Sequence, residues 1–248
     1  MFRYKLTIEY DGLRFCGWQR QKAVIPSVQE AIEAALCEVF GYAPLVEGAG
    51  RTDSGVHALG QVAHCDLQDS LPEYRIQDAL NRFLAPKGAS VIAVEAVPSD
   101  FHARFSATSR SYVYKICNRR PPTPLSDTRA WHIIQPLNIK AMQEAALALI
   151  GTHDFSSFRA SACQAPSPIK TLEDFTFTQI GEQITVSIQA RSFLHNQVRI
   201  MVGTCVKIGL GRWPTTKMQE ILEAKNRCQS GLTAPPHGLY LAHVSYES

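Results

Sequence analysis

Apolar residues recur along the chain with two different periods. In the opening segment, Tyr4–Tyr10, every second residue is apolar, which is the pattern of a β-strand with one buried face. The period then changes. Ser27-Val28-Gln29-Glu30 has the form of a helix capping box, and apolar residues recur at helical spacing as far as Gly41. The first forty residues therefore predict a strand followed by an amphipathic helix.

The same two periods continue through the rest of the chain. The first half adds strands near residues 44–49, 61–67 and 90–97 and a helix near 73–83, which gives the order βαββαβ. The second half repeats this order approximately, with strands near 112–118, 172–178, 184–190 and 239–246 and helices near 139–150, 195–208 and 215–225. We therefore predict an α+β protein with two halves, residues 1–105 and 106–248, each with a mainly antiparallel sheet.

Composition narrows the class of protein. The chain has 248 residues, of which 45% are hydrophobic, enough for one large domain or two ordinary ones. Its first residues lead directly into the opening strand, without the apolar core of a secretory signal. The seven cysteines are widely spaced and include no C-x-x-C pair, which indicates neither a disulfide framework nor a zinc site. We therefore expect a cytoplasmic protein that holds no metal.

Positive charge is concentrated in two acid-free stretches. The formal net charge is only +3, but residues 101–126 contain five cations and four aromatic residues without a single acid. Residues 183–219 contain five further cations and again no acid. Cations interleaved with aromatic rings suit a polyanion whose bases can stack, such as RNA. A solvated basic surface without a ligand is the alternative interpretation.

A single carboxylate lies in a glycine-rich segment at residues 48–57. Glycines at 48, 50 and 55 allow a sharp turn and a close approach of a ligand to the main chain, and Asp53 lies among them. The segment predicts a shaped site with Asp53 as a reactive acid. The alternative is a structural turn in which Asp53 bonds the main chain near Gly55. Arg51, on the same loop, could bind a phosphate or brace the loop.

Arg199 is a cation inside an apolar helical segment. Its neighbours, among them Val198 and Ile200, predict a helix that is buried on most sides. A buried arginine requires a partner, because removing one member of a buried ion pair costs about 3–5 kcal/mol. We predict that Asp53 is this partner, which would keep the carboxylate ionised. A structural pairing with another acid or with main-chain carbonyls is the alternative.

Four segments occur in a fixed order: GAGRTDSGVHA at 48–58, FHARFSA at 101–107, RSYVY at 110–114 and FLHNQVRIMVG at 193–203. Together they resemble the signatures of the TruA-type tRNA pseudouridine synthases. The similarity extends from the opening strand to residues 234–241 and so covers nearly the whole chain. Ser54 and Pro236 stand where that family often has alanine, and we assign chemistry to neither.

The resemblance implies an isomerase that converts uridine to pseudouridine at positions 38, 39 and 40 of the tRNA anticodon stem-loop, without a cofactor. It implies two ferredoxin-like βαββαβ halves around a central active-site cleft, and a homodimer in which tRNA contacts both subunits. Asp53 is then the catalytic residue, Arg199 its partner and Tyr112 the ring that stacks on uracil, with Tyr114 as the second choice. The carboxylate could attack the sugar, attack the base or remove a sugar proton, and each route requires it to be ionised.

The resemblance also implies a set of tRNA contacts. They lie in the loop after the opening strand, on the Asp53 segment and just before the strand that carries Tyr112. The predicted contacts are Arg14, Arg20, Lys22, Arg51, His102, Arg104, Phe105 and Arg110. His57 is expected to support the turn and to take no part in the chemistry.

Two other classes of protein share parts of this pattern. An RNA-recognition module also has the order βαββαβ, but it reads RNA through an aromatic-rich motif on a central strand, which this sequence lacks. A hydrolase or metalloenzyme could be built on Asp53, His57 and His64, yet their spacing matches no metal-ligand set or base relay. The sequence therefore favours the pseudouridine synthase.

Overall fold

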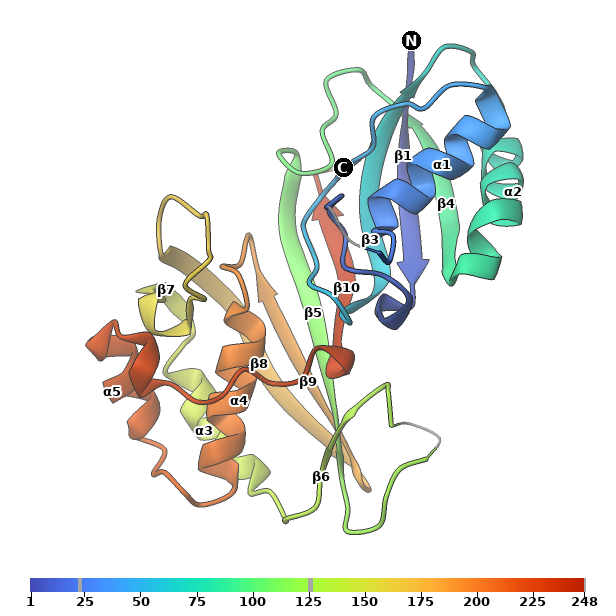
Figure 1. Cartoon of the computed structure of the whole chain (residues 1–248). Helices are drawn as coiled ribbons and strands as arrows, with labels where there is room; N and C mark the ends of the chain where they lie inside the picture. The colour runs from blue at the N-terminus through green and yellow to red at the C-terminus, as the bar shows by residue number, and fades with distance from the viewer. Residues whose placement is uncertain (22–23, 125–126, 248) are drawn as a thin grey trace. The chain divides into compact units, whose positions relative to one another are not determined.

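The computed structural model describes residues 1–21, 24–124 and 127–247, and its contacts divide the chain into two compact units. The first unit consists of Met1–Thr108 and Tyr240–Ser248, and the second consists of Ser109–Leu239. Figure 1 shows the elements of both units, coloured in chain order. The C-terminal residues belong to the first unit, because the final strand pairs there. The expected division into 1–105 and 106–248 places them in the second half instead.

The first unit contains an antiparallel sheet with two helices beside it (Figure 1). Its elements follow the order βαββαβ: β1 (Phe2–Tyr10), α1 (Val28–Phe40), β2 (Glu47–Gly48), β3 (His57–Leu67), α2 (Glu73–Leu84) and β4 (Ala89–Val97). Strand β1 lies between β4 and β3, β2 also pairs with β3, and all these pairs are antiparallel. The C-terminal strand β10 (Leu239–Tyr246) pairs in parallel with the start of β3.

Local sequence explains where these elements begin and end. The predicted inward-facing residues of β1 are at most 3% exposed. The capping box of α1 is formed: Ser27 Oγ accepts from the main-chain N–H of Glu30 at 3.1 Å, and the Glu30 carboxylate accepts from that of Ser27 at 2.8 Å. The bond from the Ser27 main chain lowers the pKa of Glu30. The helix ends at Gly41, whose φ of 77° favours glycine.

In chain order the elements of the second unit are β5 (Ala107–Asn118), β6 (Trp131–Ile133), α3 (Ile139–Leu147), β7 (Gly151–Asp154), β8 (Ile169–Ile180), β9 (Gln183–Ala190), α4 (Gln197–Gly209) and α5 (Lys217–Ala224). Its strands pair antiparallel in the order β5-β9-β8-β7, and β6 pairs with β5 in parallel. Helix α3 packs against both β8 and α4. Every residue of α4 is buried except Arg199 and Lys207. Even so, no helix in the described part of the chain is long and apolar enough to cross a bilayer.

The predicted mixed α+β class with mainly antiparallel strands is confirmed. Two short strands, β6 and β7, are additions, because three or four residues are too few to show a period. Strand β3 begins at His57, earlier than predicted, since the glycines around it resemble a turn in sequence. This longer β3 starts at the last residue of the glycine-rich segment 48–57 and so fixes one end of it.

Candidate active site

Asp53 lies on a short loop, residues 49–56, between β2 and β3, which we call the Asp53 loop. The main-chain N–H of Val56 donates to the carbonyl of Asp53 at 3.1 Å, which closes a tight turn. Gly55 within this turn has a φ of 79°, a conformation that glycine adopts without strain. Asp53 itself is half-buried, so this residue of a defined loop remains partly accessible to solvent.

The segment after β1 fixes the Asp53 loop from one side. The N–H of Trp18 donates to the carbonyl of Thr52 at 3.0 Å, and the N–H of Gly55 donates to that of Gly12 at 3.2 Å. The two chains approach so closely that a Cβ at Gly12 would lie 2.1 Å from the carbonyl oxygen of Val56. Two main-chain bonds and this close contact hold the turn in one position.

The buried side chains of Tyr10 and Gln61 also hydrogen-bond to the Asp53 loop. The hydroxyls of Tyr10 and Thr52 are 2.7 Å apart, and the amide of Gln61 donates to the carbonyl of Gly50 at 2.9 Å. Burial raises the pKa of Tyr10 to about 12, although its hydrogen bonds to Thr52 and Gln61 oppose the shift. Tyr10 is therefore neutral at physiological pH and acts as a structural hydrogen-bonding group.

Arg51 and Arg20 belong to one polar network on this side of the first unit. The exposed Arg51 donates through Nε to Gln19 Oε1 at 3.1 Å, and the amide of Gln19 donates to Gln29 at 2.9 Å. Gln29 in turn donates to the buried carboxylate of Glu33, which also pairs with Arg20. Arg20, predicted to contact tRNA, thus has a role within the fold.

Arg14 and Lys22 are the other predicted tRNA contacts in the segment after β1. Arg14 is exposed and lies 3.8 Å from the Asp11 carboxylate. Lys22 lies outside the described residues.

His57 has the environment of a structural residue. It is 2% exposed, and its ring stacks on Tyr240 with centroids 4.7 Å apart. Its Nδ1 lies 3.1 Å from the main-chain nitrogen of Gly12 and 3.3 Å from the Asp11 carboxylate. A main-chain N–H can only donate, so we assign Nδ1 of His57 as the acceptor of this bond. With that assignment the imidazole and the Asp11 carboxylate do not form an ion pair.

Three predicted RNA contacts gather in the segment before β5. The ring of His102 lies 4.3 Å from that of Phe105, and the guanidinium of Arg104 lies 5.7 Å from the Phe105 centroid. Phe105 is 73% exposed. A cation, an imidazole and a phenyl ring thus form one surface patch, of the composition that stacks on nucleobases.

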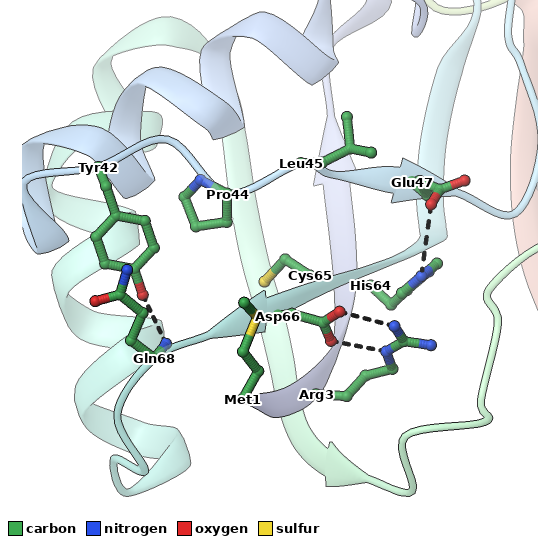
Figure 2. Close-up of a pocket in the computed structure, with 10 residues that line it drawn as sticks. All are labelled: Met1, Arg3, Tyr42, Pro44, Leu45, Glu47, His64, Cys65, Asp66 and Gln68. Carbon is green, nitrogen blue, oxygen red and sulfur yellow. Dashed lines mark hydrogen bonds and ion pairs between the residues drawn. The ribbon is translucent and has the colours of Figure 1, made fainter.

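Glu47, which lies 3.4 Å from His102 of this patch, lines a pocket of about 310 Å³. Figure 2 shows the residues that line the pocket. Glu47 and His64 from its lining, with His102, form a group whose ligand atoms are within 4.8 Å of one another. The pocket also contains a bidentate pair in which Arg3 donates to Asp66 at 2.8 and 2.7 Å. Sequence reasoning missed the group of three, because its members come from three separate elements.

Proton positions in this group disfavour a metal. His64 Nδ1 accepts from the N–H of Ala103 at 3.3 Å, and His102 Nδ1 accepts from that of Arg104 at 3.1 Å. Each ring therefore carries its proton on Nε2, and that of His102 faces Glu47 at 3.4 Å. Binding a metal through Nε2 would move both protons to Nδ1, against main-chain donors. Burial also lowers the pKa of His64, which favours the neutral form of this ring.

Arg199 lies on the first turn of α4 and is half-buried. Its Nε donates to the carbonyl of Ala234 at 2.8 Å, and its Nη1 donates to Asn196 Oδ1 at 2.7 Å. The main chains are also joined, since the N–H of Ala234 donates to the carbonyl of Arg199 at 3.1 Å. Main-chain carbonyl pairing, one alternative for this arginine, is therefore part of its environment. Asp53 belongs to the other unit, and its pairing with Arg199 stays a prediction.

The two tyrosines of β5 have different surroundings. Tyr112 is half-buried, and its ring meets that of Phe193 edge to face at 5.2 Å. Tyr114 is fully buried and donates to the carbonyl of Pro235 at 2.8 Å, and burial raises its pKa well above the usual range. Tyr112 is thus the better candidate for a base-stacking ring, because Tyr114 is part of the core.

Arg110 is buried and donates to the carbonyl of Arg191 at 2.7 Å. This contact joins β5 to the end of β9 and gives Arg110 a structural role besides its predicted contact with RNA.

Comparison with known proteins gives matches over the whole chain. The sequence profile of a tRNA pseudouridine synthase family matches residues 6–106 and 145–247. The chain is 52% identical over 247 residues to "tRNA pseudouridine synthase A" of Rhodopseudomonas palustris, with 100% of both chains covered. It is 50% identical over 246 residues to the protein of that name from Rhodospirillum rubrum, covering 99% of this chain and 88% of that protein. The protein of that name from Anaplasma phagocytophilum is 49% identical over 245 residues, covering 98% of this chain and 100% of that protein.

Proposed function

The chain belongs to the tRNA pseudouridine synthase family, and from this premise we propose that it isomerises uridine to pseudouridine at positions 38, 39 and 40 of the tRNA anticodon stem-loop. The reaction breaks the bond from N1 of uracil to C1′ of ribose, turns the base and rejoins it through C5. One observation carries the proposal: the half-buried Asp53 lies on a loop fixed by hydrogen bonds to the segment after β1. A fixed carboxylate suits a group that must meet one substrate atom.

We propose that Arg199 is the ionic partner of Asp53. A guanidinium can donate five hydrogen bonds, so the contacts with Ala234 and Asn196 do not exhaust it. Its half-buried position on an otherwise buried helix turn limits competition from water. The pairing would keep the carboxylate ionised, as every route considered for the first chemical step requires.

We propose further that the two units are ferredoxin-like halves and that the active-site cleft lies between them. The order βαββαβ and the strand order β4-β1-β3-β2 of the first unit support this. In the second unit, an antiparallel sheet with α3 and α4 supports the same arrangement. Asp53 would come from one half, and Tyr112 and Arg199 from the other.

The target uridine must leave its helical stack, because its glycosidic carbon cannot be reached inside a duplex. Flipping costs a few kcal/mol, which phosphate contacts and stacking would offset. We propose that Tyr112 stacks on the flipped uracil, with Phe193 supporting its ring edge to face. Arg51, Arg14 and the patch of His102, Arg104 and Phe105 would contact the RNA around it.

We also propose that the protein is a cytoplasmic homodimer. All seven cysteines are free thiols, which suits a reducing compartment. The family resemblance is the support for the dimer. Light scattering at working concentration should give twice the chain mass of 27.5 kDa, and a mass of one chain would refute the dimer.

The central experiment maps pseudouridine in unmodified tRNA after incubation with the wild type and with Asp53→Asn, without added metal or cofactor. We expect the wild type to modify the anticodon stem-loop, and Asp53→Asn to bind tRNA equally well but leave uridine unchanged. Asp69→Asn is the matched control, because it makes the same change at an exposed position of the first unit.

The outcomes separate three possibilities. Modification by the wild type and by Asp69→Asn, but not by Asp53→Asn, supports the isomerase with Asp53 as its catalytic group. Binding of tRNA without modification by any of the three proteins would instead mean a noncatalytic RNA-binding module. Full activity of Asp53→Asn would exclude the assigned role of this carboxylate.

A further inference from the structure

Asn196 has an unusual backbone conformation directly before α4. Its φ of 62° lies in the left-handed region, and Asn196 and Lys225 are the non-glycine residues of the described chain with positive φ. Residues with a Cβ seldom adopt this conformation, and asparagine tolerates it better than most. The strained backbone of Asn196 must therefore be offset by contacts that this residue makes.

The side chain of Asn196 does not cap its own helix. Asparagine before a helix usually accepts from a main-chain N–H of the first turn, but no such bond is formed here. Its Oδ1 instead accepts from Nη1 of Arg199, three residues later, at 2.7 Å. The left-handed backbone and the contact with the guanidinium therefore occur together.

A second acceptor fixes the same guanidinium from another direction. The carbonyl of Ala234 accepts from Arg199 Nε at 2.8 Å. The segment 231–238 that contains Ala234 is itself anchored to α4 and β5: Gly231 donates to Thr204 at 2.9 Å, and Tyr114 donates to the carbonyl of Pro235 at 2.8 Å. Nε is thus fixed by a well-anchored carbonyl, and Asn196 fixes the rotation of the terminal nitrogens.

We propose that Asn196 is a positioning residue for the isomerisation: its side chain orients the Arg199 guanidinium so that its other N–H groups address the catalytic carboxylate. The inference rests on the proposed function, in which Arg199 pairs with Asp53. It also gives a reason for the left-handed backbone, which occurs together with an Oδ1 that accepts from the guanidinium in place of the helix N–H groups. Charge-assisted bonds from a planar guanidinium are sensitive to such orientation.

The test compares Asn196→Gly, Asn196→Asp and the wild type in single-turnover pseudouridine formation on unmodified tRNA at saturating enzyme. Glycine keeps the left-handed backbone without strain and removes the acceptor. We expect a rate loss on the order of 10- to 100-fold with tRNA affinity unchanged and no fall in Tm, because misplacement of a charged group impairs the chemical step. Asn196→Asp retains an acceptor oxygen at the same place and should be faster than Asn196→Gly.

Lys225→Gly is the matched control, because it relieves the other left-handed non-glycine residue at the end of α5 and should leave the rate unchanged. The positioning role is refuted if Asn196→Gly retains the wild-type rate, if its loss appears only in tRNA affinity, or if Asn196→Asp is as slow as Asn196→Gly. An inactive wild type would refute the proposed function itself, which keeps the two failures distinguishable.

Discussion

Tyr10 connects the Asp53 loop to the core of the first unit through its hydrogen bond with Thr52. Its pKa in the fold is about 12, above the value near 10 of an exposed tyrosine, because burial disfavours the phenolate. The stabilisation linked to this shift is fully present below about pH 10 and is lost as the pH rises through about 12.

We therefore expect Tyr10→Phe to reduce the pH dependence of stability at high pH. At neutral pH the variant should lose about 1 kcal/mol of unfolding free energy with the hydrogen bond. Above about pH 10 the gap to the wild type should narrow, because only the wild type must keep a buried phenol neutral. Urea unfolding across this range tests the effect. Parallel curves at all pH values would contradict it, and Tyr74→Phe, at a 60% exposed site, is the control.

Residue-level prediction rests on recognisable segments and is limited where packing decides the role of a side chain. Asp53 and Arg199 lie in such segments, and the surroundings of both suit the roles proposed for them. The roles of Arg20 and Arg110 within the fold could not be foreseen, because their partners Glu33 and Arg191 are distant in sequence. Only the spacing of Asn196 and Arg199, three residues apart at a helix start, hinted at their contact.

At the scale of elements, the sequence predicted the long strands and helices because each shows a period over several residues. It missed what depends on contact between segments, such as the attachment of 231–238 to α4. There, a Cβ on Gly203 would lie 2.0 Å from the carbonyl oxygen of Leu232, so the helix and the segment meet backbone to backbone. No pattern of apolar residues encodes such an approach.

We expect Gly203→Ala to displace the 231–238 segment and with it the carbonyl that fixes Arg199. Overpacking of this kind costs about 1–3 kcal/mol of stability, and activity should fall as well. Gly209→Ala is the control in the same helix, because its Cβ would meet the flexible side chain of Met142, at 2.5 Å from the sulfur. Thermal unfolding and tRNA modification assays measure both effects. Equal behaviour of the two variants would show that the close approach is unimportant.

At the scale of the whole molecule, the net charge of +3 says little about RNA, whereas the distribution of cations says more. The acid-free stretch 101–126 begins in the first unit and continues into the second, so both units contribute to it. The division of the chain into two units was only partly predictable, because the C-terminal strand β10 pairs with β3 of the first unit. Local periodicity does not report such pairing between distant segments.

Salt dependence of tRNA binding should distinguish cations that contact phosphates from those that serve the fold. Arg51 is exposed on the Asp53 loop, so Arg51→Gln should reduce the slope of log affinity against log salt by about 0.7 to 0.9. Arg20 pairs with the buried Glu33, so Arg20→Gln should leave that slope unchanged. It should instead cost about 1–3 kcal/mol of stability, less than a fully buried pair because Arg20 is 59% exposed.

Titrations at several salt concentrations, together with urea unfolding of both variants, measure the two effects separately. If Arg20→Gln lowered the slope as much as Arg51→Gln, the ion pair with Glu33 would have to open on binding tRNA. If Arg51→Gln left the slope intact, the arginine would brace the loop through Gln19 and contact no phosphate. Either result would change which of these arginines is assigned a tRNA contact, since the two lie on chain segments that pack together beside Asp53.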